Sequence, residues 1–229
     1  MKLIQIAIKY CKKIVSLILI MLMFATSGSS IFANNDEHKI NDIQRNELIR
    51  QSEVINWNSF DGILNKKDNF IIIDYYTGYY FVCKRMGGGY HADIEPINKE
   101  SNNNIKKIMD SGRGGKRRPV IIMFEDGRCF LGSSFMVGHA GVDSEPYLKI
   151  LTKRSNGYGK GENYDSVKGN GMDGHICLFV EGCRNHFDGK ENKEHNKNLE
   201  FLKDMKKIGG YSYERKIYKT NWLFSTYKY

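Results

Sequence analysis

Residues 69–86 read NFIIIDYYTGYYFVCKRM. Two runs of β-branched and aromatic residues flank Thr77-Gly78, and runs of this kind favour strands. Glycine tolerates the positive φ angle that a tight turn requires. The stretch therefore predicts a β-hairpin, the strongest signal of this type in the chain, and an antiparallel sheet built outward from it.

A second hairpin is predicted further along the chain, after a basic loop. Residues 119–124 and 128–136 are strand-like runs on either side of an acidic, glycine-containing turn at 125–127. A shorter strand-like run follows at 175–180. Between these strands, residues 138–174 contain eight glycines and little periodicity. An irregular stretch of this length inside a domain is usually functional.

Three segments have the spacing of apolar residues expected for helices. They cover 34–58, 97–110 and 191–208, and Asn41 offers a cap for the first. The aromatic and basic tail at 211–229 could supply one or two closing strands. The predicted fold is one α+β domain, with a hairpin-rich β-sheet core and flanking helices, after an N-terminal signal segment.

Residues 1–33 have the features of a secretory signal. They hold four lysines and no acid, and 14–25 is almost wholly apolar. Cleavage is expected after Ala33. The alternative is an uncleaved membrane anchor, although the apolar run is shorter than the ~20 residues that a span needs. The expected division is 1–33 signal peptide or anchor, 34–68 N-terminal helical segment, and 69–229 globular α+β domain with the site.

The chain of 229 residues has a formal net charge of +9, which invites a nucleic-acid-binding interpretation. Four of these charges lie in the signal segment, so residues 34–229 carry +5. An exported location argues against nucleic acid, whereas moderate positive charge suits peptidoglycan or another anionic cell-wall polymer. We therefore expect a secreted or cell-envelope-associated, extracytoplasmic protein that meets the membrane only through its N-terminal segment.

Four cysteines follow the signal segment: Cys83, Cys129, Cys177 and Cys183. An even number permits two disulfides in three connectivities. Cys83 and Cys129 each lie in the second strand of a predicted hairpin, so these two could pair. A bond between Cys177 and Cys183 would exclude a nucleophilic role for Cys177.

Cys177 is the candidate nucleophile. His175 lies two positions earlier on a strand-like run, so both side chains share one face, and a neighbouring imidazole stabilises the attacking thiolate. His139, between small residues, offers a general base with room for a substrate backbone. The alternative is an inert core cysteine beside a hydrogen-bonded histidine. Hydrogen-bond contact between His139 and Cys177 would favour the enzyme.

Metal chemistry is the alternative. His91-x-Asp93 on an extended segment could present two ligands to zinc, with other histidines completing a site that keeps one open position. The full candidate set is His91, Asp93, His139, His175 and His186. Glu95 could serve as a base near such a metal. The chain has no H-E-x-x-H or C-x-x-C pattern, so the signal for zinc is weak.

The order of motifs from Asp74 to His195 carries a resemblance. The segments read DYYTGYYFVCKRMGGGYHADIEP at 74–96, KRRPVIIMFEDGRCFLGSSFMVGHAGVDSEP at 116–146 and YGKGENYDSVKGNGMDGHICLFVEGCRNH at 158–186. Together they resemble a domain of secreted cell-wall proteins of Gram-positive bacteria, which often follows peptidoglycan-binding repeats. The resemblance implies location rather than reaction. The chain departs from it at Phe179, where a second histidine is expected.

A more distant similarity is to L,D-transpeptidase catalytic domains, which carry a histidine-glycine element and a downstream Ser-His-Gly-Cys element on a β-rich fold. The counterparts are the His-Ala-Gly run that starts at His139 and the Gly-His-Ile-Cys run that ends at Cys177. Gly174 replaces the family's serine and Ile176 its glycine. The resemblance implies Cys177 as nucleophile, His139 as base and His175 as a structural or oxyanion-side neighbour.

We therefore expect a peptidoglycan-acting cysteine enzyme, L,D-transpeptidase-like, that transfers an acyl group or cleaves a peptide bond without a cofactor. His91, Asp93, Glu95 and Asp143 are the expected substrate contacts. One alternative is a zinc-dependent cell-wall hydrolase built on the His/Asp set. Another is a noncatalytic wall-binding module that holds glycan through the aromatic tail and the +5 charge.

Overall fold

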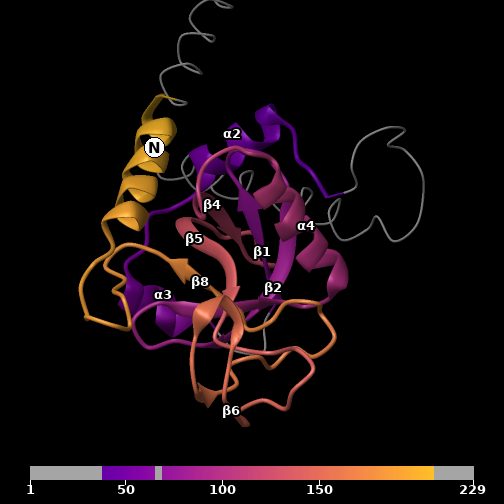
Figure 1. Cartoon of the computed structure of the whole chain (residues 1–229). Helices are drawn as coiled ribbons and strands as arrows, with labels where there is room; N and C mark the ends of the chain where they lie inside the picture. The colour runs from indigo at the N-terminus through magenta and orange to yellow at the C-terminus, as the bar shows by residue number, and fades with distance from the viewer. Residues whose placement is uncertain (1–37, 65–68, 209–229) are drawn as a thin grey trace, which may run out of the picture.

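The computed structural model describes residues 38–64 and 69–208 (Figure 1). The predicted signal or anchor at 1–33 and the predicted closing strands at 211–229 lie outside these residues. Within the described ranges, no helix combines the length and the apolar character needed to cross a bilayer.

Six antiparallel strands close into a barrel in the order β1-β2-β3-β8-β5-β4. The strands are β1 (Asn69–Asp74), β2 (Tyr80–Gly87), β3 (Ala92–Pro96), β4 (Arg117–Met123), β5 (Cys129–His139) and β8 (His175–Phe179). The two predicted hairpins are β1–β2 and β4–β5. Closure pairs β1 with β4 and β3 with β8, so every barrel strand has a neighbour on both sides. The α+β class and the strand-rich core are as expected.

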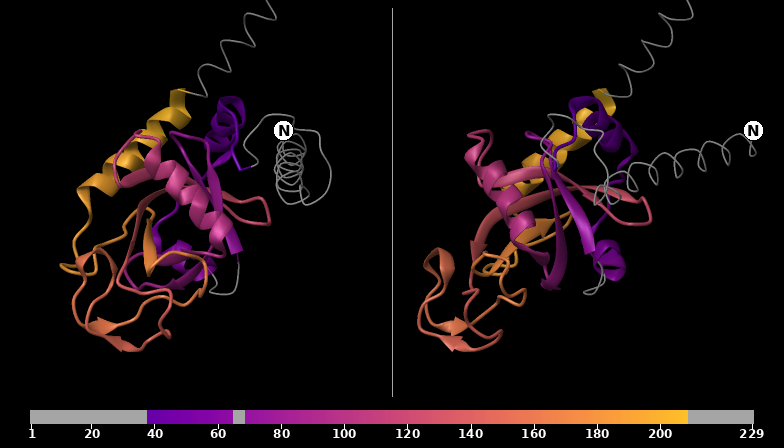
Figure 2. Two further views of the ribbon diagram at one scale, coloured as in Figure 1. Left: turned by 45° about the vertical axis from the view of Figure 1, so that its right-hand side comes forward. Right: turned by 90° about the vertical axis from the view of Figure 1, so that its right-hand side faces the viewer.

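Helices flank the barrel. They are α2 (Asp42–Gln51), α3 (Trp57–Ile63), α4 (Lys99–Asp110) and a C-terminal helix over 193–208. The predicted cap is present, because the Asn41 side chain accepts the Gln44 N–H and the Gln44 side chain accepts the Asn41 N–H. Figure 2 shows the C-terminal helix running along the outside of the barrel.

The single helix expected over 34–58 is instead two helices. The chain leaves the helical path at Ser52. The next residue, Glu53, donates its N–H to the Cys129 carbonyl and accepts the Leu131 N–H at its carbonyl. These two bonds attach the segment to β5. Asn56 then caps α3 by accepting the N–H of Ser59. Tertiary hydrogen bonds therefore divide a segment whose apolar spacing is helical throughout.

Alternation along the strands produces two apolar layers. On β1, Phe70 and Ile72 join the cluster inside the barrel, to which all six strands contribute. Ile71 and Ile73 face outward and join a second cluster. This outer layer is covered by α2 and by the helix over 193–208, which contributes Leu202.

No disulfide joins any two of the four cysteines in the described part of the chain. Pairing of Cys83 with Cys129 does not occur because the two side chains point into different layers. Cys83 lies in the inner cluster and Cys129 in the outer one. Cys177 and Cys183 are also free, so no disulfide blocks the thiol of Cys177.

The glycine-rich segment 138–174 forms a lobe below the barrel in Figure 1, with the short strands β6 (Ile150–Leu151) and β7 (Gly161–Glu162) and a 3-10 turn at Ser155–Gly157. Buried polar side chains order it. The Asn163 amide donates to the carbonyls of Val142, Glu145 and Pro146 and accepts the Val142 N–H. Hydrogen bonds, rather than apolar packing, therefore shape this lobe.

Candidate active site

The candidate site lies where β3, β8 and β5 adjoin. Cys177, at the centre of β8, pairs with Asp93 on β3 and with Phe135 on β5. The register of β5 shifts after Phe135, and this irregularity brings His139 opposite His175. Shifts of this kind re-aim side chains and are common beside active sites. Strand pairing thus gathers residues from three distant parts of the sequence.

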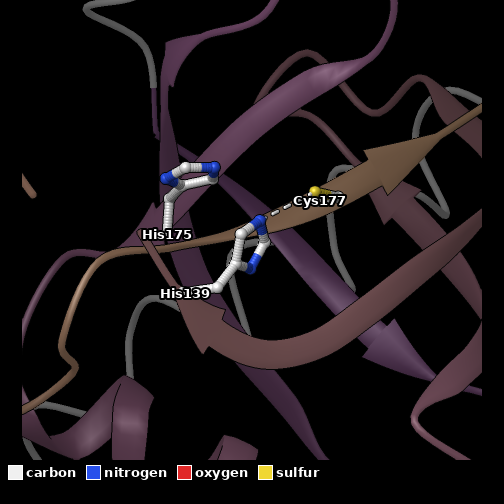
Figure 3. A group of neighbouring side chains, drawn as sticks. All are labelled: His139, His175 and Cys177. Atoms are coloured by element: carbon white, nitrogen blue, oxygen red, sulfur yellow. Dashed lines mark hydrogen bonds between the residues drawn. The ribbon is translucent and has the colours of Figure 1, made fainter. Parts of the chain in front are cut away.

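Cys177 and His139 contact each other directly. Figure 3 shows the Sγ atom facing the His139 ring, and Sγ lies 3.4 Å from Nε2. The other ring nitrogen, Nδ1, lies 2.9 Å from the Val137 carbonyl. Because a carbonyl only accepts, Nδ1 carries the proton and Nε2 presents a lone pair to the thiol. His139 is therefore oriented to take the proton of Cys177.

His91 and His175 are oriented in the same way. Nδ1 of His91 donates to the Arg184 carbonyl at 2.8 Å, and Nδ1 of His175 donates to the Tyr164 carbonyl at 3.2 Å. Their Nε2 atoms lie 3.5 and 3.6 Å from Oδ1 of Asp93. Backbone carbonyls thus turn both unprotonated nitrogens toward one carboxylate.

His186 completes the surroundings of Asp93 from the solvent side. Its half-exposed side chain places Nε2 3.5 Å from Oδ1 of Asp93. Burial on its own would raise the pKa of Asp93, but the interactions with His186 and with the nearby imidazoles of His175 and His91 outweigh it and lower that pKa. Asp93 is therefore a carboxylate at neutral pH, and the same interaction raises the pKa of His186.

The thiol and its base are both neutral at rest. Burial lowers the pKa of His139, and likewise that of His91, to about 4. Burial raises the pKa of the Cys177 thiol, and Asp93 adds to the rise. The resting site therefore holds a thiol hydrogen-bonded to a neutral imidazole, and a thiolate forms only as the proton moves.

Phe179, the position at which the predicted resemblance expects a histidine, is part of a ring stack. Its ring centroid lies 4.3 Å from that of His91 and 3.7 Å from that of His195. His195 comes from the C-terminal helix, contacts the Ser133 hydroxyl at 2.8 Å, and has its pKa lowered by burial to about 3. Phe179 thus stacks against the rings of both His91 and His195.

Glu95 and Asp143, expected as substrate contacts, bind the backbone of the lobe. Glu95 is fully buried and accepts the N–H groups of Ser166 and Val167, each at 2.8 Å. Burial raises its pKa to about 7. Asp143 accepts two glycine N–H groups of the segment 169–171. Both carboxylates anchor the lobe, and their contact with substrate stays a prediction.

Tyr158 is a site residue that the sequence did not single out. Its ring centroid lies 5.4 Å from that of His139, and its side chain is partly exposed. Burial raises the pKa of its phenol, and the nearby Cys177 adds to that rise. Tyr158 belongs to the lobe, so its contact with His139 arises only on folding. In the sequence, its only mark is that it is an aromatic residue between glycines, Gly157 and Gly159.

A surface pocket of about 390 Å³ adjoins the His91 side of the site. It is lined by Asn56, Trp57, Asn58, Gly89, Tyr90, Gly182 and Arg184. Arg184 is the residue whose carbonyl orients His91, and the Tyr90 ring lies 6.0 Å from that of His186. A pocket of this size accommodates a small ligand or one residue of a polymer.

The structure brings together most of the predicted catalytic and metal-binding side chains. Two groups have ligand atoms that all lie within 4.8 Å of one another: His139, His175 and Cys177, and His91, Asp93 and Cys177. Both groups include Cys177, which the predicted metal set left out. The nucleophile and metal hypotheses therefore concern one and the same sulfur atom.

Comparison with known proteins found no matching family model, curated protein or solved structure. The interpretation of the site therefore depends on its own geometry. That geometry defines a buried cysteine–histidine pair with a carboxylate and two further histidines around it.

Proposed function

We propose that this chain is an exported cysteine acyltransferase that acts on the peptide stems of peptidoglycan. The observation that carries the proposal is the 3.4 Å contact between Sγ of Cys177 and Nε2 of His139. An inert core cysteine needs no aligned base. Here the Val137 carbonyl holds the imidazole in the tautomer that accepts a proton from the thiol.

The reaction proceeds in two half-reactions. Sγ of Cys177 bonds to a substrate carbonyl carbon as the thiol proton passes to Nε2 of His139. The amide C–N bond then breaks, the leaving amine takes that proton, and a thioester remains on Cys177. An incoming amine or water gives its proton to His139 as it bonds to the thioester carbon, the C–S bond breaks, and the proton passes from His139 to the departing sulfur. An amine produces transpeptidation and water produces hydrolysis.

The lobe and the pocket supply two sides of a substrate path. Tyr158 flanks His139, and the guanidinium group of Arg154 lies over the rings of Tyr158 and Tyr164. The pocket near Tyr90 lies on the other side, next to His91 and His186. We assign peptidoglycan as substrate because the predicted export signal, the +5 charge and the motif order all point to the cell wall.

The test is turnover of purified muropeptides, followed by mass spectrometry of released and exchanged stems. Replacing Cys177 with alanine should abolish turnover, and His139→Ala should reduce it by roughly 10²–10⁴-fold, the usual contribution of a positioned base. The matched control is Cys183→Ala, which removes another buried free thiol and should keep wild-type turnover.

Full activity of the Cys177→Ala variant would rule out the mechanism. Binding of the wild-type chain to sacculi without any product would favour the noncatalytic wall-binding module instead. An intact-mass experiment gives a second readout, because an acyl adduct should form on the wild type and be absent from Cys177→Ala.

A further inference from the structure

We propose that His91, Asp93 and Cys177 form a zinc-binding site that captures the nucleophilic sulfur and holds the enzyme inactive. The regulatory meaning rests on the proposed function. The metal site does not, because it follows from the positions of three ligand atoms. A ring nitrogen of His91, a carboxylate oxygen of Asp93 and Sγ of Cys177 all lie within 4.8 Å of one another, and Nε2 of His91 lies 3.5 Å from Oδ1 of Asp93. Asp93 and Cys177 are paired across β3 and β8, which makes their spacing rigid.

Two of these ligand atoms are left without a hydrogen bond. Nε2 of His91 and Oδ1 of Asp93 are both buried, and neither has a partner among the residues that the structure describes. They lie 3.5 Å apart, too far for a hydrogen bond. Nε2 carries a lone pair because Nδ1 donates to Arg184. Two electron-rich atoms thus face each other across a gap that a cation would stabilise.

The size of the gap suits zinc. Zinc bonds to imidazole nitrogen and carboxylate oxygen are about 2.0–2.2 Å long, which places two ligands of a tetrahedron roughly 3.3–3.6 Å apart. The observed separation of 3.5 Å falls in this range. His186, with Nε2 also 3.5 Å from Oδ1 of Asp93, borders this group of three ligands on its solvent side. Its half-exposed side chain gives the metal a route from solvent.

The surroundings of His91 are those of a metal ligand. Ligating histidines almost always donate their second ring N–H to a carbonyl or carboxylate, which fixes the tautomer and raises the basicity of the ligating nitrogen. His91 donates in this way to Arg184. Phe179 stacks on the ring and restricts its rotation. The ring is therefore already oriented for binding before a metal arrives.

Donor type and charge favour zinc over harder ions. Nitrogen and sulfur ligands suit zinc, whereas magnesium and calcium prefer oxygen. On binding, the Cys177 thiol loses its proton to solvent and the sulfur donates a lone pair to Zn²⁺, with no change of oxidation state. The two negative ligands, Asp93 and Cys177, then balance the two positive charges. The occupied site adds no net charge to a buried region.

Zinc and acyl transfer exclude each other because they use one sulfur. In the metal-free state Sγ of Cys177 is hydrogen-bonded to His139. In the zinc-bound state the lone pair that would attack a carbonyl is committed to the metal. The enzyme should therefore work only where free zinc is scarce, and a chelator should restore it.

The test is a cobalt(II) titration of the purified, reduced full chain, followed by zinc competition. Cobalt bound to a thiolate gives a charge-transfer band, which reports Cys177 directly. We expect one site per chain, no band in Cys177→Ala, and at least tenfold weaker zinc binding in His91→Ala and in the isosteric variant Asp93→Asn. His38→Ala, at a histidine paired with Glu100 instead, should bind like the wild type.

His139→Ala separates this site from the second group, His139 with His175 and Cys177. We expect this variant to lose turnover and to keep zinc binding within about threefold. A loss of zinc binding as large as that of His91→Ala would place the metal in the second group and overturn the proposal. Absence of the cobalt–thiolate band from the wild type would also overturn it.

The regulatory part has its own readout. Zinc should inhibit muropeptide turnover with the affinity measured in the titration, EDTA should reverse the inhibition, and magnesium should have no effect. Zinc binding without inhibition would refute the regulation. If the wild type has no turnover at all, the proposed function fails while the cobalt titration still decides the metal site.

Discussion

Asp93 and Cys177 face each other across the β3–β8 pair. A carboxylate beside a thiol disfavours the thiolate, and it adds to the larger effect of burial in raising the pKa of Cys177. The residue that would serve as nucleophile is thus kept protonated by burial and, in addition, by its neighbour Asp93. Attack by the sulfur then depends on proton transfer to His139, and no thiolate forms until a substrate or a metal enters the site.

Replacing Asp93 with asparagine should make Cys177 more reactive. The change removes the negative charge and keeps the shape, so the pKa of the thiol should fall. We expect alkylation by iodoacetamide at pH 8 to become about three- to tenfold faster, since one unit of pKa changes the thiolate fraction tenfold. Adduct formation is followed by intact mass. Asp143→Asn is the control, and an unchanged or slower rate in Asp93→Asn would contradict the prediction.

Activity should be lost on acidification only at an unusually low pH. Burial lowers the pKa of His139 to about 4, so this base stays unprotonated down to that pH. We expect kcat/KM on a muropeptide to be flat from about pH 6 to 8 and to fall as His139 gains a proton near pH 4. A fall of kcat/KM near the ordinary histidine pKa of about 6.5 would contradict the prediction. It would show that the low pKa of His139 does not govern activity.

Asp74 should be important for stability. Arg118 donates two hydrogen bonds to its carboxylate, at 2.6 and 2.9 Å, and both side chains are almost fully buried. Asp74→Ala leaves the buried guanidinium without its carboxylate, which we expect to lower the free energy of unfolding by about 3–5 kcal/mol. Urea denaturation measures it. Asp126→Ala breaks an exposed pair with Arg128 and should cost about 1 kcal/mol or less.

Glu95 should make the protein less stable as the pH rises from acid to neutral. Burial raises its pKa in the folded state to about 7, above the unfolded value of about 4.3. The folded chain therefore binds the extra proton, so this contribution to stability is complete below about pH 4 and is lost as pH rises through 7.

The whole effect of Glu95 is at most about 4 kcal/mol, from the difference between the two pKa values. Urea midpoints are measured between pH 4 and 8 for the wild type and Glu95→Gln. As pH rises across this window, the midpoint of the wild type should fall relative to that of Glu95→Gln, because only the wild type carries the titrating group. Parallel curves for the two proteins would disprove the assignment.

Local patterns in the sequence were sufficient for most secondary structure. The hairpin around Gly78, the turn at 125–127 and the cap at Asn41 depend on residues a few positions apart, and all three are confirmed. The helix over 34–58 was predicted wrongly because hydrogen bonds from Glu53 to distant β5 divide it. Apolar spacing cannot report a partner some eighty residues away in the chain.

The sequence by itself determined the hairpins, the α+β class and the candidate pair His139 and Cys177, because turn chemistry, strand alternation and residue type are local properties. Only the tertiary structure decided that these two residues touch, since the contact spans 38 positions and needs barrel closure and the register shift in β5. It also placed Asp93 against the same sulfur. Strand register is a cooperative property of the packed sheet, so which residues meet across strands is settled only when the barrel closes.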